Sequence, residues 1–433
     1  MKAEIISLDD IQVSEETVHP PGLSPGCLHY CPPTSAGWGI VRVALLVPES
    51  VMLFVSPSGC ARHAAIAGIQ LGFWDRFFCY RMSETDIVSG AYMDEIPRVC
   101  EKILHRTGMK ALIICSTCID DLLGSDYDNL VVEIERKTGV PVRLCRMDPI
   151  CMHTPNAPPL KVQETVYKFL QSSATHDDSI NILGNFAHID ETSEFHEVLC
   201  QTKEREIRHI TNYSSYEEFQ VMAASSYNLL IKPAGILAAH DLHTRLNIPC
   251  ILAYHSYGIG RIDGMYHMLE KTFNETFELD DYRDEAIDTT EWFTNVHGKS
   301  VSVAIGSTAN AAPFELARTF VEIGIDVPYI FADAVQVWEK EHVKWLQRHN
   351  PSMKVFSSSH PKMVDAQNMQ LDADYAIGFD AGYFCRGAKT IPWGLEKQPF
   401  GYTGLISLLR EMDNVTDIQQ DLKSMVYASG LVI

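Results

Sequence analysis

The feature that most constrains this chain is a regular alternation of short apolar runs with longer segments of helical period. Runs such as VMLFV at 51–55 and KALIIC at 110–115 flank helix-like sequence such as AYMDEIPRVCEKILHRTG at 91–108. Short runs of branched and aromatic residues favour strands, and apolar residues spaced three or four apart favour helices. Strands that alternate with helices build parallel sheets covered by helices on both faces. The sequence therefore predicts an α/β fold.

The alternation falls into three blocks, which indicates three domains. A polar stretch, QSSATHDD at 171–178, closes the first block, and an acidic, helix-like stretch at 261–299 separates the second block from the third. Each block is expected to form a Rossmann-like, doubly wound parallel sheet. The predicted domains are 1–175, 176–295 and 296–400. We expect amphipathic helices within 400–433 to complete the first of them.

The charge balance excludes some classes of partner. The chain has 35 basic and 56 acidic residues, a formal net charge of −21, which argues against nucleic acid and anionic membranes as partners. No apolar stretch is long enough to span a membrane, and the first twenty residues lack the apolar segment of a secretory signal. We therefore expect a cytoplasmic protein. Disulfides are disfavoured in that compartment, so its twelve cysteines point to metal or redox chemistry, or to buried thiols.

Two cysteines stand directly after predicted strands. Cys60 ends SPSGC, and Cys118 ends STC. Ligands of open parallel sheets gather at the carboxyl ends of strands. Cys60 also precedes a predicted helix, whose N-terminal dipole favours a thiolate, and Gly59 allows a close approach of the backbone to a bound group. Ser116 and Thr117 could donate hydrogen bonds to the sulfur atoms of an iron–sulfur cluster.

Eight of the other cysteines divide into two groups. Cys27 and Cys31 lie in a proline-rich loop at 19–37, whose stiffness would hold a metal ligand at little entropic cost. Most of a second group should be buried apolar residues, namely Cys79, Cys100, Cys115, Cys145, Cys200 and Cys250. The wide spacing of Cys31, Cys60 and Cys118 is not by itself a metal signature, so a metal site and inert thiols both stay open.

Three short motifs in order resemble those of the nitrogenase component 1 superfamily. They are Cys31-Pro-Pro-Thr-Ser-Ala, then Ser-Pro-Ser-Gly-Cys60, then Ser-Thr-Cys118 followed by LLGSD at 122–126. SINILGNF at 179–186 and NLLIKPAG at 228–235 are similar to the family's second domain. The resemblance covers nearly the whole chain. That family includes nitrogenase subunits, their cofactor-assembly homologues and the dark protochlorophyllide and chlorin reductases.

The resemblance implies an iron–sulfur protein. Family members hold a [4Fe-4S] cluster, or half of an eight-iron P-type cluster, between subunits. By this resemblance, the cluster ligands in this chain would be Cys31, Cys60 and Cys118, and Gly59 would lie beside the cluster. Cys27 is the alternative to Cys31. Three thiolates leave a fourth position for a second component-1 subunit, identical or different. The chain has no P-loop, so the family's ATP-dependent iron-protein reductase would be a separate partner that delivers low-potential electrons.

Departures from the family pattern limit the function. The loop at 231–235 lacks the cysteine, and the segment at 391–404 lacks the histidine, that hold the large cofactor in catalytic nitrogenase subunits. This argues against dinitrogen reduction by this chain alone, and leaves a second metallocofactor or a tetrapyrrole-like substrate open. Cys385 is a candidate for lining that pocket, or a buried structural thiol. Two other functions also fit: a scaffold for cofactor assembly, and an α/β small-molecule binding protein with inert cysteines.

Overall fold

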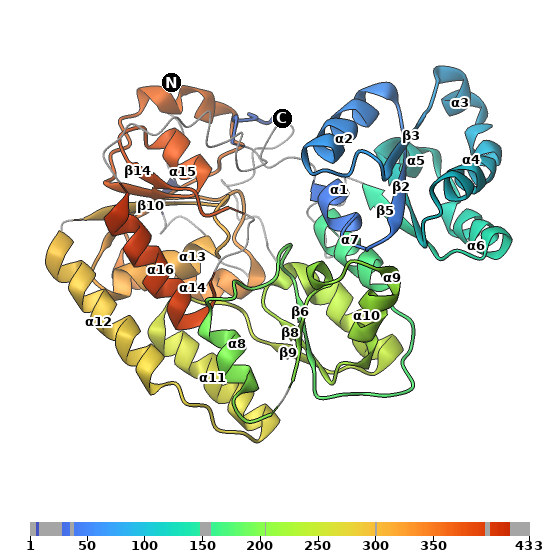
Figure 1. The fold of residues 1–433 in the computed structure, drawn as a ribbon. Helices are drawn as coiled ribbons and strands as arrows, with labels where there is room; N and C mark the ends of the chain where they lie inside the picture. Colours follow the sequence, from blue (N-terminus) through green and yellow to red (C-terminus); the bar gives the residue numbers. More distant parts are fainter. Residues whose placement is uncertain are drawn as a thin grey trace. The chain divides into compact units, whose positions relative to one another are not determined.

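The structure is a computed structural model that describes residues 6–7, 28–34, 39–147, 157–203, 205–298, 301–394 and 399–415. The chain divides into two compact units (Figure 1). Unit 1 contains Met1–Ala36, Ile189–Lys203 and His255–Ile433, and unit 2 contains Gly37–His188 and Glu204–Tyr254. Among the described residues, no helix combines the length and the apolar character needed to cross a bilayer.

The first sheet of unit 2 is a four-stranded parallel sheet. Its order is β3 (Phe77–Arg81), β2 (Ser50–Ser56), β4 (Ala111–Thr117), β5 (Val142–Met147). Every residue of β2 and β4 is buried, because apolar side chains alternate between two cores on opposite faces. The helices of this part are α2 (Ser58–Gln70), α3 (Glu84–Ser89), α4 (Tyr92–Thr107), α5 (Cys118–Leu123) and α6 (Tyr127–Thr138).

The second sheet of unit 2 is also parallel. Its order is β7 (Ile207–Arg208), β6 (Ile180–Leu183), β8 (Tyr227–Leu230), β9 (Cys250–Leu252). Helix α7 (Pro158–Tyr167) packs against α1 (Gly39–Ala44), against α10 (Ile236–Leu246) and against the 3-10 turn η5 (Pro233–Gly235). Three short helical segments complete this part: η3 (Ile210–Asn212), α9 (Tyr216–Phe219) and η4 (Gln220–Ala224). One apolar core contains residues of both sheets, including Phe54 and Leu230, so the two sheets form one body.

Unit 1 is built on a six-stranded sheet. Its order is β1 (Ile6–Ser7), β12 (Lys354–Phe356), β11 (Asp326–Phe331), β10 (Ser302–Gly306), β13 (Tyr375–Ile377), β14 (Lys389–Ile391). All pairs are parallel except β1 with β12. The helical segments of this sheet are α13 (Pro313–Glu322), η6 (Val337–Glu339), α14 (Lys340–His349), η7 (Pro361–Asn368) and α15 (Phe379–Phe384).

A group of four helices outside the sheet layer completes the described part of unit 1. They are α8 (Glu194–Cys200), α11 (Ile259–Phe273), α12 (Asp280–His297) and α16 (Gly401–Asn414). Helix α16 packs against the other three, and Figure 1 shows it running alongside α12. Helices α11 and α12 occupy the acidic stretch that the sequence predicts as helical.

The α/β prediction with doubly wound parallel sheets is confirmed. Each sheet takes its parallel strands from one block of the sequence, but β1, from the first block, joins the six-stranded sheet in antiparallel orientation. The three-domain division at 175, 295 and 400 stays a prediction. Within the predicted C-terminal helices, α16 belongs to unit 1, and residues 416–433 lie outside the described residues.

Candidate functional site

Cys60 and Cys118 lie at the carboxyl ends of two neighbouring strands. Strand β2 pairs with β4, with Phe54 opposite Cys115, so both strands end at the same edge of the sheet. Cys60 is the third residue of α2, which begins two residues after β2. Cys118 is the first residue of α5, directly after β4. Both cysteines are partly exposed. The parallel pairing therefore brings together two thiols that are 58 positions apart in the chain.

The two thiols interact electrostatically. Partial burial raises the pKa of the Cys60 thiol, and the neighbouring Cys118 raises this pKa further because two adjacent thiolates repel each other. A bound cation removes that repulsion and stabilises both thiolates. Beside them, apart from its chain neighbours and the backbone of its own helix, no described residue has an atom within 4 Å of the position that a Cβ on Gly59 would take. The pair therefore has the chemistry and the adjacent space that a thiolate-ligated metal group requires.

A buried carboxylate holds the turn that carries Cys118. Asp120 is fully buried and accepts hydrogen bonds from the hydroxyls of Tyr92 and Tyr127, each at 2.9 Å. It also accepts from the backbone N–H of Thr117 at 2.9 Å and from the Thr117 hydroxyl at 3.4 Å. The Thr117 hydroxyl, a predicted cluster donor, thus points to Asp120. The Oγ of Ser116 is buried and has no hydrogen-bond partner among the described residues.

Sequence reasoning missed Asp120. The signal was present as Thr117 followed three residues later by an acid, the pattern of a capping box at a helix start. The two tyrosines that complete the network are 28 positions before and 7 positions after Asp120. No local pattern links those tyrosines to the carboxylate.

The surface beside Cys118 is apolar. Leu122 is 74% exposed and Leu123 is 46% exposed, both in the last turn of α5. Large exposed leucines next to two accessible thiols are typical of a surface that another protein covers.

The other predicted ligands are placed differently. Cys31 is exposed and belongs to unit 1, whereas Cys60 and Cys118 belong to unit 2. The backbone N–H of Tyr30 donates to the carbonyl of Ser359 at 2.8 Å, which fixes the Cys31 segment near the end of β12. Cys27 lies outside the described residues. Within either unit, no three cysteine, histidine or acidic side chains of the described chain come together as a metal site.

Cys385 is buried in the core of unit 1. It follows α15 and packs among the apolar residues of that core, and burial raises the pKa of its thiol to about 12. This environment is that of a structural thiol. Of the six cysteines predicted to be mostly core, Cys100, Cys115 and Cys145 are buried and Cys250 is partly buried, whereas Cys79 and Cys200 are exposed.

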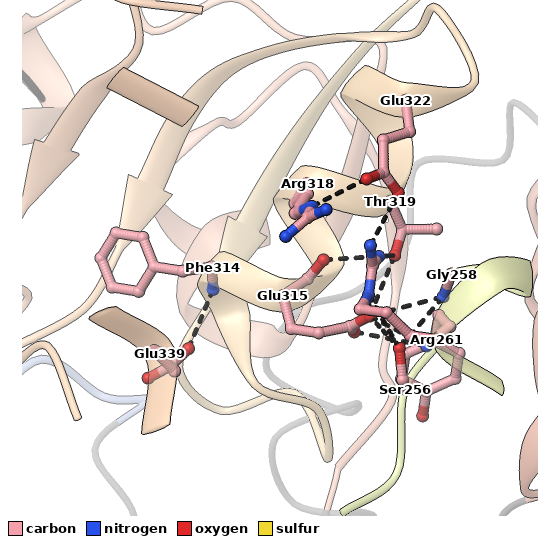
Figure 2. Close-up of polar contacts among 10 residues, drawn as sticks. Ser256, Gly258, Arg261, Phe314, Glu315, Arg318, Thr319, Glu322 and Glu339 are labelled. Atoms are coloured by element: carbon pink, nitrogen blue, oxygen red, sulfur yellow. Dashed lines mark hydrogen bonds and ion pairs between the residues drawn. The ribbon is translucent and has the colours of Figure 1, made fainter. Parts of the chain in front are cut away.

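Unit 1 contains a second buried carboxylate network (Figure 2). Glu315 accepts hydrogen bonds from Arg261 Nε at 2.8 Å, from the Ser256 hydroxyl and from the backbone N–H of Gly258 at 3.4 Å. Burial raises the pKa of the Glu315 carboxyl, but Arg261 and the hydrogen bonds outweigh burial and lower it overall.

A second carboxylate, Glu339, accepts a hydrogen bond from the backbone N–H of Phe314 at 3.0 Å. Burial raises the pKa of Glu339 to about 7, and the neighbouring Glu315 adds to this effect.

Comparison with known proteins places the whole chain in context. A family model described as nitrogenase component 1 type oxidoreductase matches residues 35–417. The light-independent protochlorophyllide reductase subunit N of Heliobacterium mobile is 26% identical over 119 residues, which are 27% of this chain and 26% of that protein. Its counterpart from Heliobacterium modesticaldum is 28% identical over 119 residues. This chain thus spans about a quarter of the length of these two relatives.

A third relative aligns over a longer stretch. The nitrogenase iron-molybdenum cofactor biosynthesis protein NifE of Sinorhizobium fredii is 22% identical over 362 residues, which are 78% of this chain and 72% of that protein. Among solved structures, nitrogenase Cp1 at pH 6.5 has a TM-score of 0.69 and 13% identity, and the match covers 93% of this chain and 95% of that one. The structure at pH 5 has a TM-score of 0.65 and 15% identity, covering 97% and 94%. These structural matches show a shared fold.

Proposed function

The chain belongs to the nitrogenase component 1 type oxidoreductase family, and from this membership we propose that it is an iron–sulfur subunit of a nitrogenase-like enzyme. It would relay low-potential electrons from an ATP-dependent iron-protein reductase to a substrate or cofactor. The observation that carries the proposal is the meeting of Cys60 and Cys118 at one edge of a parallel sheet.

The proposed ligands come from more than one part of the assembly. Cys60 and Cys118 supply two thiolates, and Cys31 supplies a third. A second component-1 subunit, a copy of this chain or a different one, completes the set and covers the exposed Leu122 and Leu123. A cluster bound there would take up and release electrons one at a time. Burial by the partner would exclude water, and Asp120 would hold the Cys118 turn in place.

The test is iron and sulfide content after purification without oxygen. We expect the wild-type preparation, with its partner subunit, to be brown, to contain iron and sulfide, and to give an electron paramagnetic resonance signal when reduced. Cys60→Ala and Cys118→Ala should lose the iron and the signal. Cys79→Ala is the matched control, because Cys79 is an exposed cysteine on the same sheet. An iron-free wild-type complex, or variants that keep the full signal, would refute the proposal.

A second function is supported by one specific observation. The match to NifE, a cofactor biosynthesis protein, covers 78% of this chain. A scaffold that carries a cofactor during assembly would use the same cysteines. Turnover separates the two functions, since a relay subunit oxidises the reductase in the presence of substrate and a scaffold passes its cofactor to another protein. The loop at 231–235, which lacks a cysteine, disfavours dinitrogen as the substrate in either case.

A further inference from the structure

Strand β3 lies at the edge of the first sheet of unit 2 and lacks the usual protection of such an edge. In the order β3-β2-β4-β5 it pairs only with β2. Its first four residues, FFCY at 77–80, carry no charge, and all five of its residues are at least partly exposed. Edge strands are normally protected from further pairing by charged side chains, proline or a covering helix. An apolar edge without these features is a template for another strand.

The opposite edge of the same sheet, β5, shows this protection. Arg143 forms an ion pair with Glu135, and Arg146 forms one with Asp121. Helix α7 also packs against β5. The two edges of one sheet are therefore treated differently, and β3 is the one that is open to another strand.

The backbone of β3 has free hydrogen-bonding groups at alternate residues. The N–H of Met52 donates to the carbonyl of Arg76, and the N–H of Met82 donates to the carbonyl of Ser56. Alternate residues of a strand direct their backbone groups to the same side, so the even-numbered residues of β3 bond to β2. The odd-numbered residues direct their N–H and C=O groups away from the sheet, where no other described residue bonds to them. These residues are Phe77, Cys79 and Arg81.

The sequence of β3 is complementary to itself in antiparallel orientation. Only a two-fold axis at Cys79 places all the outward-facing residues opposite those of a second copy, so that every free group gains a partner. In this register Phe78 lies opposite Tyr80 of the second copy, and Phe77 lies opposite its Arg81. Aromatic pairs across strands are stabilising, and so is a cation beside an aromatic ring. No like charges face each other, because the strand has no carboxylate and one arginine.

Exposed apolar side chains flank the strand on both sides. Trp74, before β3, is 72% exposed, and Val88, on α3 after β3, is 88% exposed. Antiparallel pairing brings the segment before β3 of one copy beside the segment after β3 of the other. Stable interfaces bury about 1,000 Å² or more in total, so we expect Trp74 and Val88 to add to the contact between the strands.

We propose that two copies of this chain pair through β3, antiparallel and about a two-fold axis at Cys79, which joins their sheets into one continuous sheet. This contact is separate from the cluster interface. In the joint sheet the carboxyl ends of the strands of the two copies lie at opposite edges, so the Cys60 and Cys118 pairs point away from each other. The pairing does not depend on the proposed function, and under that function it joins two relay subunits.

Two variants of residue 79 test the backbone pairing. Cys79→Pro removes the N–H that faces the second copy but keeps the ladder with β2, because this N–H does not bond to β2. Cys79→Ala keeps the N–H and removes only the thiol. The assay is sedimentation velocity of the full chain at about 0.15 M salt, which screens the repulsion between two acidic chains. We expect the wild type and Cys79→Ala to self-associate equally, and Cys79→Pro to self-associate at least about tenfold more weakly.

A surface variant keeps the test independent of any effect of proline on folding. Trp74→Lys changes a side chain that is 72% exposed, so the chain should fold as the wild type does and still self-associate more weakly. Trp292→Lys, at an exposed tryptophan of unit 1, is the matched control and should self-associate as the wild type does. Thermal melting checks the folding of each variant.

Cross-linking tests the register. The two-fold axis places the Cys79 residues of the two copies opposite each other, with Cα atoms about 5.5 Å apart. A short bis-maleimide should therefore join them, since each of its two double bonds takes up one thiol and its proton. Desolvation raises the pKa of the Cys79 thiol to about 11, so the reaction is run at about pH 8.5 to provide some thiolate. The covalent dimer should be absent from Cys79→Ala and unchanged in Cys200→Ala, whose cysteine is exposed in unit 1.

Three results would overturn the inference. They are equal self-association of the wild type and Cys79→Pro, a wild-type covalent dimer that persists in Cys79→Ala, and a wild-type chain that stays monomeric because another segment or protein covers β3. Iron content is measured on the same preparations. A chain that holds iron but does not pair through β3 refutes only this inference, whereas an iron-free chain that pairs through β3 refutes only the relay.

Discussion

Replacing Asp120 by alanine tests whether the carboxylate network holds the Cys118 turn. The side chain accepts hydrogen bonds from two tyrosine hydroxyls and one backbone N–H, all at 2.9 Å and all in a buried setting. The Tyr92 hydroxyl can turn to the Ser125 hydroxyl at 2.6 Å, so the change leaves two buried donors, the Tyr127 hydroxyl and the Thr117 N–H, without an acceptor. Each such donor costs about 1–3 kcal/mol, which gives a loss of about 2–6 kcal/mol. Typical domains have about 5–15 kcal/mol of stability, so this loss is large.

Asparagine at position 120 keeps the shape of the aspartate side chain but removes its negative charge, so it tests the contribution of the charge alone. Asp120→Asn keeps one oxygen for the hydroxyls of Tyr92 and Tyr127, but its amide N–H₂ faces the backbone N–H of Thr117 or displaces it. One charge-assisted hydrogen bond is lost, so we expect a cost of about 1–3 kcal/mol. The order of stability should therefore be wild type, then asparagine, then alanine.

The assay combines urea denaturation of the apo-protein with the alkylation rate of Cys118 under native conditions. Asp120→Ala should lower the free energy of unfolding by the stated amount and should speed alkylation, because α5 loses its anchor. Asp128→Ala is the control, since Asp128 is 83% exposed and pairs with Arg146 only at the surface. If Asp120→Ala stays within about 1 kcal/mol of this control, or if Cys118 alkylation is unchanged, the reasoning about the network is wrong.

Three further changes give distinct results. The pKa of Glu339 in the folded protein, about 7, lies above its ordinary value, so the free energy of unfolding falls as pH rises from about 4.5 through 7. Relative to the wild type, Glu339→Gln should therefore be more stable by up to about 3 kcal/mol above pH 7 and equally stable below about pH 4.5. Urea denaturation at both pH values tests this, and an equal difference from the wild type at both would contradict it. Arg261→Met leaves Glu315 buried without its cation, and thermal melting should reveal a loss of about 3–5 kcal/mol, whereas a loss below about 1 kcal/mol would mean that the pair is solvated. Gly184→Ala should lower the melting temperature because of its positive φ and the facing carbonyl of Lys232, whereas Gly59→Ala, with open space around it, should not; equal melting temperatures would refute the backbone contact.

Much of the fold follows from local sequence patterns. The apolar run at 51–55 lies within β2 and the run at 110–115 lies largely within β4, because fully buried parallel strands need apolar side chains on both faces. The proximity of Cys60 and Cys118 follows from the same pattern, since neighbouring parallel strands end at one edge. Chain order and period were sufficient for these features.

Long-range contacts set the rest. The segment 189–203 leaves the second sheet and packs in unit 1, where the Ser193 hydroxyl donates to the carbonyl of Phe400, 207 positions away. Cys31 is likewise placed by the bond between Tyr30 and Ser359. Nothing in the local sequence at 28–34 or 189–203 indicates those partners, because the contacts depend on how complete sheets and helices pack.

Buried charge was equally hidden from sequence reasoning. Asp120 and Glu315 are of residue types that usually lie at the surface, and only the structure shows that both are buried. Each has hydrogen-bond partners within the chain, so both carboxylates stabilise the local structure.

The core of unit 2 gives a physical reason why the Cys60 and Cys118 thiols are held in place without a bound group. The apolar core contains Cys115, three residues before Cys118 on β4, and Cys60 packs against the same core. Close-packed interiors resist deformation, so two thiols attached to one core keep a fixed separation. Groups that rigid elements hold in place before a ligand arrives need little further ordering when it binds. The cysteine pair therefore meets the geometric requirement for binding a thiolate-ligated group at a low entropic cost.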